Sequence, residues 1–482
     1  MLDALWLILL LLANVWLVSV FATRILPLDG WISPISFWLP FYLLNYPVRA
    51  ALLFAANGSE FERDLTVWDH EFLCGEIVWG LAYATLFAVI LLGVYLQVRQ
   101  SFPYRLNSAS HADAGNQPLS AGMVPVFAAL FLAYGLVFLY QAASGELFTL
   151  YSSLDDLKRP FFVNLLLQTI CLKWLLLAYA FLRVQRSKSA FVLVLICGCL
   201  MIELCRAVVS TAKGDLVTMV LLWVACFWIV RRRLPVFTMT SAALLILAFA
   251  LYSHTVRIYG TVSDGGAPLK RTVRENLQIA HDFYADRGSK WGEQAGHIVS
   301  RFSYLDAVIL IQREGAVLPD GSYVLGSLVE LNNVIPRFLW PDRPHLSFNH
   351  AMTHAVWKMS RVHFLEMPIG RIGESAFVLN WAGLVYAPLY AIVWYWLYRK
   401  CFLEAYDDIG RAFYLSLICL AVIPDAHLIY NWKSLVVVGI TAFILRLGDV
   451  RRPQSPRVFD GKRPIPQMHD TACQQRPLRH AI

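Results

Sequence analysis

The chain has 482 residues, of which 58% are hydrophobic and 14% aromatic, while only 15% are charged. This composition excludes an ordinary soluble domain, in which about a quarter of the residues carry charge. The formal net charge of +8 would suggest a nucleic-acid partner in a soluble chain. In so apolar a chain the lysines and arginines are instead expected at loop ends on the cytoplasmic side of a membrane, and no nucleic-acid partner is expected.

Apolar stretches recur along the chain, several of them long enough to cross about 30 Å of hydrocarbon. In chain order the predicted transmembrane spans are residues 5–21, 32–55, 77–96, 124–140, 161–182, 190–209, 215–230, 236–252, 376–398, 412–422 and 434–445. The first is expected to be retained, because Asp3 precedes it and the basic segment of a signal peptide does not. These stretches predict an all-α polytopic membrane protein with about eleven transmembrane helices.

The second predicted span is the least regular, because three prolines interrupt it and Arg49 lies near its end. A charged side chain that faces lipid at mid-depth costs about 3 kcal/mol. Arg49 is therefore expected to face protein or to extend toward the membrane surface.

Basic turns follow the third, fifth, seventh and ninth predicted spans, whereas the connections after the second and fourth are acidic. Lysine and arginine in short loops mark the cytoplasmic side. The expected parts are transmembrane helices 1–8 (residues 1–253), a large periplasmic loop (254–373), transmembrane helices 9–11 (374–447) and a disordered basic cytoplasmic tail (448–482). Helical periodicity within the loop, at residues 271–315, predicts two amphipathic helices lying on the membrane surface.

Motifs of soluble enzymes are absent from the sequence, including GxxxxGK[ST], GxSxG and HExxH. Two pairs of acids resemble the metal-binding pair of an enzyme that uses nucleotide sugars. Asp155 and Asp156 are predicted to be external, where nucleotide sugars are not expected. Asp407 and Asp408 lie in a predicted cytoplasmic turn, where a helix cap or solvated acids are the favoured interpretation.

Polar groups are concentrated between Asn332 and Trp381, at the end of the periplasmic segment. Prolines forbid a continuous helix in the first part of this stretch. Arg337, Arg343 and Arg371 carry planar guanidinium groups, which suit a phosphate or diphosphate better than lysine would. The alternative is that these arginines meet lipid head groups at the membrane surface.

Histidine and glutamate supply candidate bases in the same stretch. His350 and His354 are four residues apart and can share a helix face. No third ligand has metal-site spacing with them, so no metal is expected and a general-base or hydrogen-bonding role is favoured. Glu374 is another candidate base, although the helix dipole alone can favour a carboxylate at a helix start. Lys213, on the predicted external side, is either a substrate contact or an interfacial anchor.

The periplasmic segment and the span after it contain the runs IPRFLWPDRP and MPIGRIGESAFVLNWAG. These runs resemble the large periplasmic loop and following span of bacterial O-antigen and exopolysaccharide polymerases of the Wzy type. Gly373, Glu374, Asn380 and Gly383 match the Gly-Glu and Asn-x-x-Gly pattern of that family. RFSYLDAVILI, with Arg301, is similar to a second family pattern upstream. The motifs do not separate the polymerases from the related O-antigen ligases.

The resemblance implies a glycosyltransferase of the bacterial inner membrane. It would move a growing glycan chain from polyprenyl diphosphate onto a sugar hydroxyl of a lipid-linked repeat unit, at the periplasmic face. The implied partners are the lipid-linked oligosaccharide, membrane lipids, a chain-length regulator and a flippase. No metal or other cofactor is implied.

The resemblance also implies roles for individual residues on the external side. Those that would contact the substrate, chiefly its diphosphate, are Arg301, Arg337, Arg343, Arg371 and Asn380. Lys213 lies outside the matched stretch and is a further candidate for a substrate contact. The candidates for the catalytic base are Glu374, His350 and His354. Trp340, Trp357 and Trp381 could stack on sugar faces, although tryptophan is also common at membrane interfaces.

Two other functions stay open. An O-antigen ligase would use the same donor with a different acceptor, and a flippase or transporter would move the same lipid-linked glycan. Transporters usually show repeated halves and charges spread through their spans. The sequence instead shows one dominant external segment, which argues against a transporter.

Overall fold

A computed structural model describes residues 2–57, 71–103, 123–144, 169–186, 189–210, 214–231, 233–260, 273–286, 304–314, 370–405, 407–422 and 432–450. All regular elements among these residues are helices, as the composition predicts. The α-helices are α1 (Leu2–Val20), α2 (Leu26–Asp29), α3 (Pro34–Leu43), α4 (Arg49–Ala56), α6 (Cys74–Ser101), α8 (Met123–Ala143), α10 (Leu172–Val184), α11 (Ala190–Ser210), α12 (Gly214–Arg231), α13 (Val236–Gly260), α14 (Val273–Asp286), α16 (Tyr304–Glu314), α19 (Gly370–Leu379), α20 (Tyr386–Tyr398), α21 (Asp408–Leu417) and α22 (Trp432–Val450). Short 3₁₀ or π turns lie at Phe21–Ile25, Gly30–Ile32, Leu44–Val48, Thr169–Cys171, Asn380–Val385, Arg399–Leu403 and Ile418–Val422.

In the described part of the chain, 7 helices are long and apolar enough to cross a membrane. They are Leu2–Ile25, Pro34–Ala56, Cys74–Ser101, Val124–Ala143, Ala190–Val209, Gly214–Arg231 and Val236–Ser253. These match the first four predicted spans and the sixth to eighth. The fifth predicted span overlaps α10, and the ninth overlaps α19 and α20. The tenth overlaps α21, and the eleventh lies within α22. The all-α, multi-pass membrane architecture is therefore confirmed, whereas the total number of spans stays a prediction.

The outward surfaces of several long helices are apolar. Leu132 and Leu136 on α8, Val194 on α11, and Phe237 and Leu244 on α13 are all exposed. Soluble monomers rarely expose contiguous apolar surface on this scale. The surface is therefore suited to contact with lipid tails.

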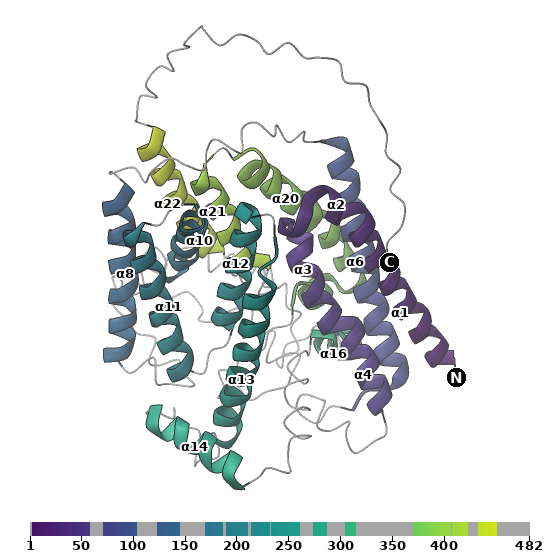
Figure 1. Ribbon diagram of the computed structural model, residues 1–482. Helices are drawn as coiled ribbons and strands as arrows, with labels where there is room; N and C mark the ends of the chain where they lie inside the picture. Colours follow the sequence, from purple (N-terminus) through teal and green to yellow (C-terminus); the bar gives the residue numbers. More distant parts are fainter. Residues whose placement is uncertain are drawn as a thin grey trace, which may run out of the picture.

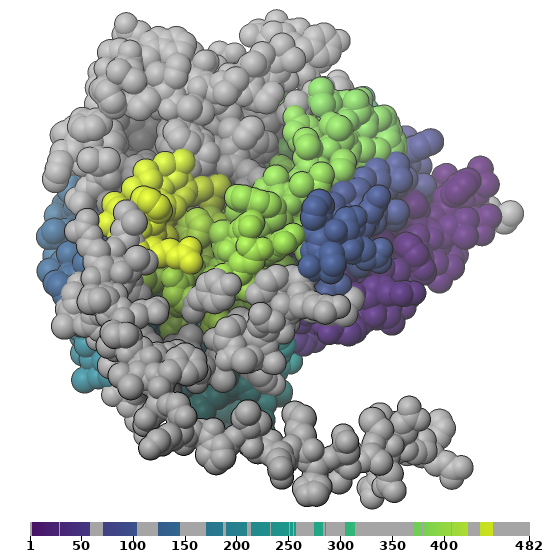
Figure 2. Space-filling view, turned by 90° about the horizontal axis from the view of Figure 1, so that it is seen from above, coloured from purple at the N-terminus to yellow at the C-terminus, as the bar shows by residue number. Residues whose placement is uncertain are grey.

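Two groups of helices stand side by side (Figure 1). One contains α8, α10, α11 and α12, and the other contains α1, α3, α4, α6 and α20. α21 joins them, because it packs against α10 and α22 while its continuation, Ile418–Val422, contacts α3. In the end view of Figure 2, α20 (green) lies beside α6 (blue), with α1 (purple) at the edge, in agreement with the contacts of α6 with both.

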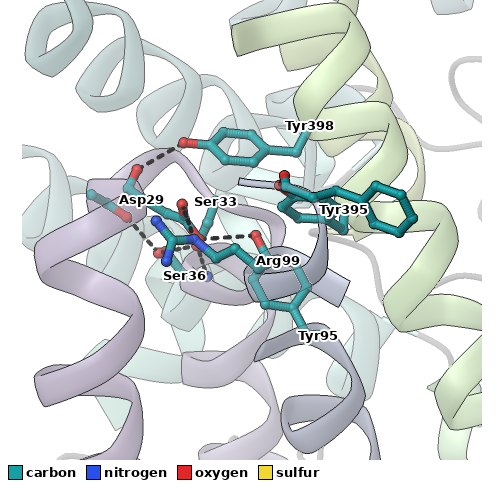
Figure 3. A network of polar contacts seen from close by, with 9 residues as sticks. Asp29, Ser33, Ser36, Tyr95, Arg99, Tyr395 and Tyr398 are labelled. Atoms are coloured by element: carbon teal, nitrogen blue, oxygen red, sulfur yellow. Dashed lines mark hydrogen bonds and ion pairs between the residues drawn. The ribbon is translucent and has the colours of Figure 1, made fainter. Parts of the chain in front are cut away.

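A polar network ties the C-terminal end of α6 to its neighbours (Figure 3). Arg99 Nε donates to the Asp29 carboxylate at 2.7 Å, and the Tyr95 hydroxyl donates to it at 3.3 Å. From α20, the Tyr398 hydroxyl donates to the Asp29 carbonyl at 2.9 Å, and the Tyr395 hydroxyl donates at 2.6 Å to the carbonyl that follows α6. Consequently α2, α6 and α20 meet at one end of the molecule.

Ion pairs join the ends of α10, α21 and α22 in the same way. Asp408 at the start of α21 lies 3.2 Å from Arg183 Nε and 2.6 Å from Arg186 Nη1. Asp407 caps α21 through an amide of its first turn and pairs with Arg446 at 3.2 Å. The helix-cap interpretation is thus confirmed for Asp407, whereas Asp408 is buried among arginines and is not solvated. These ends are the ones that the sequence places in the cytoplasm, and that assignment stays a prediction.

α16 lies inside the protein and not on a surface. Its residues 305–311 are buried, and the helix packs against α6 and α19. Gly80 on α6 permits the close approach, because a Cβ there would meet the Ile309 side chain at 2.7 Å. The prediction of a surface helix is therefore wrong for α16. Its acidic residue, Asp306, turns toward Arg49 and not toward water.

The ninth predicted span is not one continuous helix. A 3₁₀ segment, Asn380–Val385, separates α19 from α20. Asn380 has a φ of 51, in the left-handed region that asparagine tolerates better than most residues. A Cβ at Gly383 would overlap the Ser375 carbonyl oxygen, so glycine is required where the chain returns against α19.

Candidate functional site

α19 carries two predicted site residues, Arg371 and Glu374, inside the protein. The helix begins at Gly370, whose φ of 68 suits glycine. The Gly-Arg-Ile-Gly run at residues 370–373 forms the first turn of this helix. Arg371 is 1% exposed and Glu374 is 5% exposed. Both are held there because the apolar residues of α19, such as Phe377, are also buried and the helix packs against α16.

Two aromatic rings of α20 hold the Arg371 guanidinium. Its central carbon lies 4.6 Å from the centroid of the Trp394 ring and 5.3 Å from that of Tyr390. A desolvated cation–π contact of this kind contributes about 2 kcal/mol. The alternative in which Arg371 reaches lipid head groups at the surface is wrong, because the side chain is buried.

Glu374 lies one helical turn beyond Arg371, past the first turn of α19. The influence of a helix dipole falls off within the first turn. The dipole therefore does not account for this carboxylate by itself. A buried carboxylate in a membrane protein is costly, and such groups commonly mark functional sites.

The neighbour of Glu374, Ser375, connects α19 to α6. Its hydroxyl donates to the Ile372 carbonyl at 2.7 Å and lies 2.9 Å from the Tyr83 hydroxyl. The Tyr83 hydroxyl donates to the Asn380 carbonyl at 3.2 Å. Tyr83 thus fixes both α19 and the break that follows it. Asn380, predicted to contact substrate, lies exposed in that break.

A cavity of about 310 Å³ lies beside the break. Its lining in the described part of the chain consists of Glu76, Trp79, Ile309, Gln312, Arg313 and Trp381. Trp381 is linked to α19 through Tyr83 of α6. Its ring centroid lies 5.2 Å from that of Tyr83, and the Tyr83 hydroxyl contacts Ser375 on α19. Sequence reasoning named Trp381 as a sugar contact but missed Trp79, which resembles any other tryptophan near the end of an apolar span.

A buried ion pair fixes α16, which lines this cavity. Arg49 Nε and Nη2 donate to the two Asp306 carboxylate oxygens at 2.9 and 2.6 Å. Both side chains are 0% exposed. The prediction that Arg49 faces protein is confirmed. Its partner was missed because Asp306 was expected to lie on a surface helix.

A second group of charges lies within α10, α11 and α12. Lys173 Nζ donates to Glu203 at 3.0 Å and to Asp215 at 2.6 Å, and Arg206 Nη1 donates to Glu203 at 3.1 Å. The Tyr134 hydroxyl of α8 also donates to Glu203. Hydropathy concealed this group, because Lys173, Glu203 and Arg206 each stand among apolar residues in the sequence.

The remaining predicted site residues lie outside the described part of the chain: Lys213, Arg301, Arg337, Arg343, His350 and His354. Among the described residues, no three His, Cys, Asp or Glu side chains gather as metal ligands. Metal independence stays a prediction.

The fold and the site define an all-α, multi-pass membrane protein with a buried arginine and a buried glutamate on one short helix beside an aromatic cavity. Comparison of the chain with protein-family models, curated proteins and solved structures finds no match in any of the three. The resemblance to the polymerases therefore rests on the sequence motifs alone.

Proposed function

We propose that the protein is a polysaccharide polymerase of the bacterial inner membrane. It transfers a glycan chain from polyprenyl diphosphate to a sugar hydroxyl of a lipid-linked repeat unit at the periplasmic face. The observation that carries the proposal is the burial of Arg371 together with Glu374 on α19. The motif resemblance across residues 301–383 supports it from the sequence.

The reaction needs a cation and a base, and α19 offers one of each. The acceptor oxygen bonds to the anomeric carbon while the bond from that carbon to the diphosphate oxygen breaks, so negative charge grows on the leaving diphosphate. Arg371 is always charged, and its fixed donors would stabilise this charge more strongly in a buried site than in water. Glu374 would accept the proton that the acceptor hydroxyl loses.

A transporter for the same lipid-linked glycan is the second candidate. The sequence argued against it because charges spread through the spans were not evident. Lys173, Glu203 and Asp215, however, lie together within α10, α11 and α12. Charges inside a membrane often mark transport pathways and proton relays, so this group is a specific observation in favour of the transporter.

Deletion of the gene separates the candidates through the lipid-linked glycans that accumulate. A polymerase defect leaves single repeat units on the periplasmic face. A ligase defect leaves full-length chains on the lipid, and a transporter defect traps single units on the cytoplasmic face. Either of the last two results would overturn the proposal.

Within the polymerase proposal, Arg371→Lys is expected to lower polymer yield at least about tenfold, which corresponds to about 1.4 kcal/mol. Lysine keeps the charge but loses the planar fork of donors that matches a diphosphate. Yield and chain length are measured on gels at matched protein abundance. Arg24→Lys is the control, because Arg24 is exposed in the turn after α1. Near-normal polymer from Arg371→Lys would remove Arg371 from the diphosphate site.

A further inference from the structure

The cavity beside the break after α19 combines exposed tryptophan rings with polar side chains. Trp79 on α6 is 63% exposed, and Trp381 on the 3₁₀ segment is 41% exposed. Both tryptophans line the cavity, together with polar residues of α6 and α16. Its volume of about 310 Å³ is at the lower end of the range for small-molecule sites, roughly 300–1,000 Å³. It is therefore suited to a small ligand or to one unit of a larger one.

The two indole rings form a corner. Their centroids are 6.2 Å apart and their planes are inclined at 85°. The Tyr83 ring packs against Trp381 at an interplanar angle of 70°. The Tyr83 hydroxyl is itself held, because it donates to the Asn380 carbonyl and lies 2.9 Å from the Ser375 hydroxyl. Edge-to-face contacts of this kind contribute about 0.5–1.5 kcal/mol each. Trp381 is therefore held in one orientation, and its exposed face is available to a flat ligand.

Polar groups complete the lining. Arg313 Nη1 lies 3.7 Å from Glu76 Oε2, and Arg313 also donates to the Glu71 carbonyl at 3.2 Å. Gln312 Nε2 has no hydrogen-bond partner among the residues that the structure describes. The cavity thus offers a carboxylate, an amide and a guanidinium next to two aromatic faces.

The charges decide between classes of ligand. Glu76 balances Arg313, so these groups add no net positive charge, which disfavours a phosphate or diphosphate. Three polar side chains in the lining disfavour a lipid tail, because that ligand would leave them desolvated without partners. A sugar ring has an apolar face of C–H groups for an indole and a rim of hydroxyls for the carboxylate and amide.

We propose that this cavity is a carbohydrate subsite, in which one pyranose ring stacks on Trp79 or Trp381, donates a hydroxyl hydrogen bond to Glu76 and accepts one from Gln312 Nε2. Its assignment to the glycan of the polymerase rests on the proposed function, but sugar binding itself does not. The Trp381 ring contacts Tyr83, and the Tyr83 hydroxyl contacts Ser375, which is the residue beside Glu374. A ring held here would place the adjoining part of the glycan near α19.

The test measures binding to the full-length chain in lipid nanodiscs. The probe is the water-soluble oligosaccharide released by mild acid from the lipid-linked glycans of the producing cell, and sodium diphosphate is the anionic comparison. Saturation-transfer NMR and calorimetry should show oligosaccharide binding that Trp79→Leu weakens at least about tenfold. Trp16→Leu is the matched control, since Trp16 on α1 is similarly exposed but does not line the cavity. It should bind as the native chain does.

A second variant distinguishes a loss of binding from a loss of folding. Gln312→Leu keeps the size of the side chain and removes an amide whose Nε2 has no hydrogen-bond partner among the described residues, so the fold should keep its stability. It should weaken oligosaccharide binding while the melting temperature stays unchanged. Undetectable binding to the native chain, or an affinity in both the Trp79 and Gln312 variants equal to that of the native chain, would overturn the proposal. Tighter binding of diphosphate than of oligosaccharide at this cavity would do the same.

The outcomes also separate the subsite from the proposed function. Loss of oligosaccharide binding in Trp79→Leu, combined with normal polymer in the deletion strain, would keep the subsite and reject the polymerase. A deletion strain that stops at single repeats, combined with full binding and full polymer length in Trp79→Leu, would keep the polymerase and reject the subsite.

Discussion

Arg49 and Asp306 show how single charges are accommodated in the interior of this protein. Each is fully buried, and the bidentate geometry satisfies the carboxylate with two charge-assisted hydrogen bonds. Removal of one partner from such a pair leaves an isolated buried charge, which costs about 3–5 kcal/mol. Replacement of both partners by apolar residues of similar size is often nearly neutral.

We therefore expect Arg49→Met and Asp306→Leu to destabilise the protein by about 3–5 kcal/mol each, and the double variant to recover most of that loss. Unfolding in mixed micelles, followed by circular dichroism, provides the free energies. The control is Arg399→Met at the partly exposed pair with Glu404, where the expected change is about 0–1 kcal/mol. Additive losses in the double variant would show that the two side chains do not stabilise each other.

At the scale of elements, the break between α19 and α20 places the candidate site. Without it, Trp381 would continue along a helix axis and would not turn back against Tyr83 and α6. The break depends on Asn380 in the left-handed region and on the contact of Gly383 with the Ser375 carbonyl.

Substitutions in the break should have different effects. Asn380→Val is expected to destabilise the protein by about 1–2 kcal/mol, because left-handed backbone is strained for side chains other than Gly, Asn and Asp. Asn380→Gly should be neutral or stabilising.

Gly383→Ala should lower the amount of folded protein sharply, since its Cβ would overlap a backbone oxygen. Gly93→Ala is the control, because nothing lies within 4 Å of a Cβ there; it should stabilise α6 by about 0.5–1 kcal/mol. Equal abundance and melting of the Gly93 and Gly383 variants would contradict this account.

Sequence patterns located the elements better than they located their environments. Hydropathy identified the long helices because lipid-facing and core-facing residues are both apolar. It missed the break, since Asn380–Val385 interrupts the helix without lowering hydropathy much. Periodicity identified α16, but an amphipathic pattern does not distinguish a membrane surface from a protein interior that contains Arg49. The site residues on α19 came from motif resemblance, whereas Lys173, Glu203 and Trp79 depend on contacts between segments far apart in the chain.

At the scale of the whole molecule, the contacts at one end of the bundle constrain topology. The ends of α6, α10, α20 and α22 and the start of α21 are joined there by Asp29, Asp407 and Asp408 with their partners. The candidate site, the cavity and Arg49 lie toward the other end of α6. If the basic ends are cytoplasmic, the site must face the periplasm.

Cysteine labelling of the two ends of α6 tests this arrangement in a chain without native cysteines. Asn57 is exposed just before the segment that leads to α6. Asn57→Cys should therefore react with a membrane-impermeant maleimide once the outer membrane alone has been made permeable. Gln100→Cys, exposed in the last turn of α6, should react only after the inner membrane is disrupted. The reverse pattern would place the site in the cytoplasm and would contradict the proposed function.

The pairing of Arg49 with Asp306 also has a consequence for biogenesis. The two residues are separated by 257 positions. At a synthesis rate of about 5–20 residues per second, Asp306 is therefore synthesised roughly 13–50 s after Arg49. During that interval Pro34–Ala56, the least apolar of the candidate spans in the described part of the chain, carries an uncompensated charge. Nascent chains arrested before residue 306 should hold this segment loosely in the translocon or outside the bilayer, exposed to membrane proteases. Synthesis of the distant helix α16 would thus determine when an early helix becomes a stable part of the membrane.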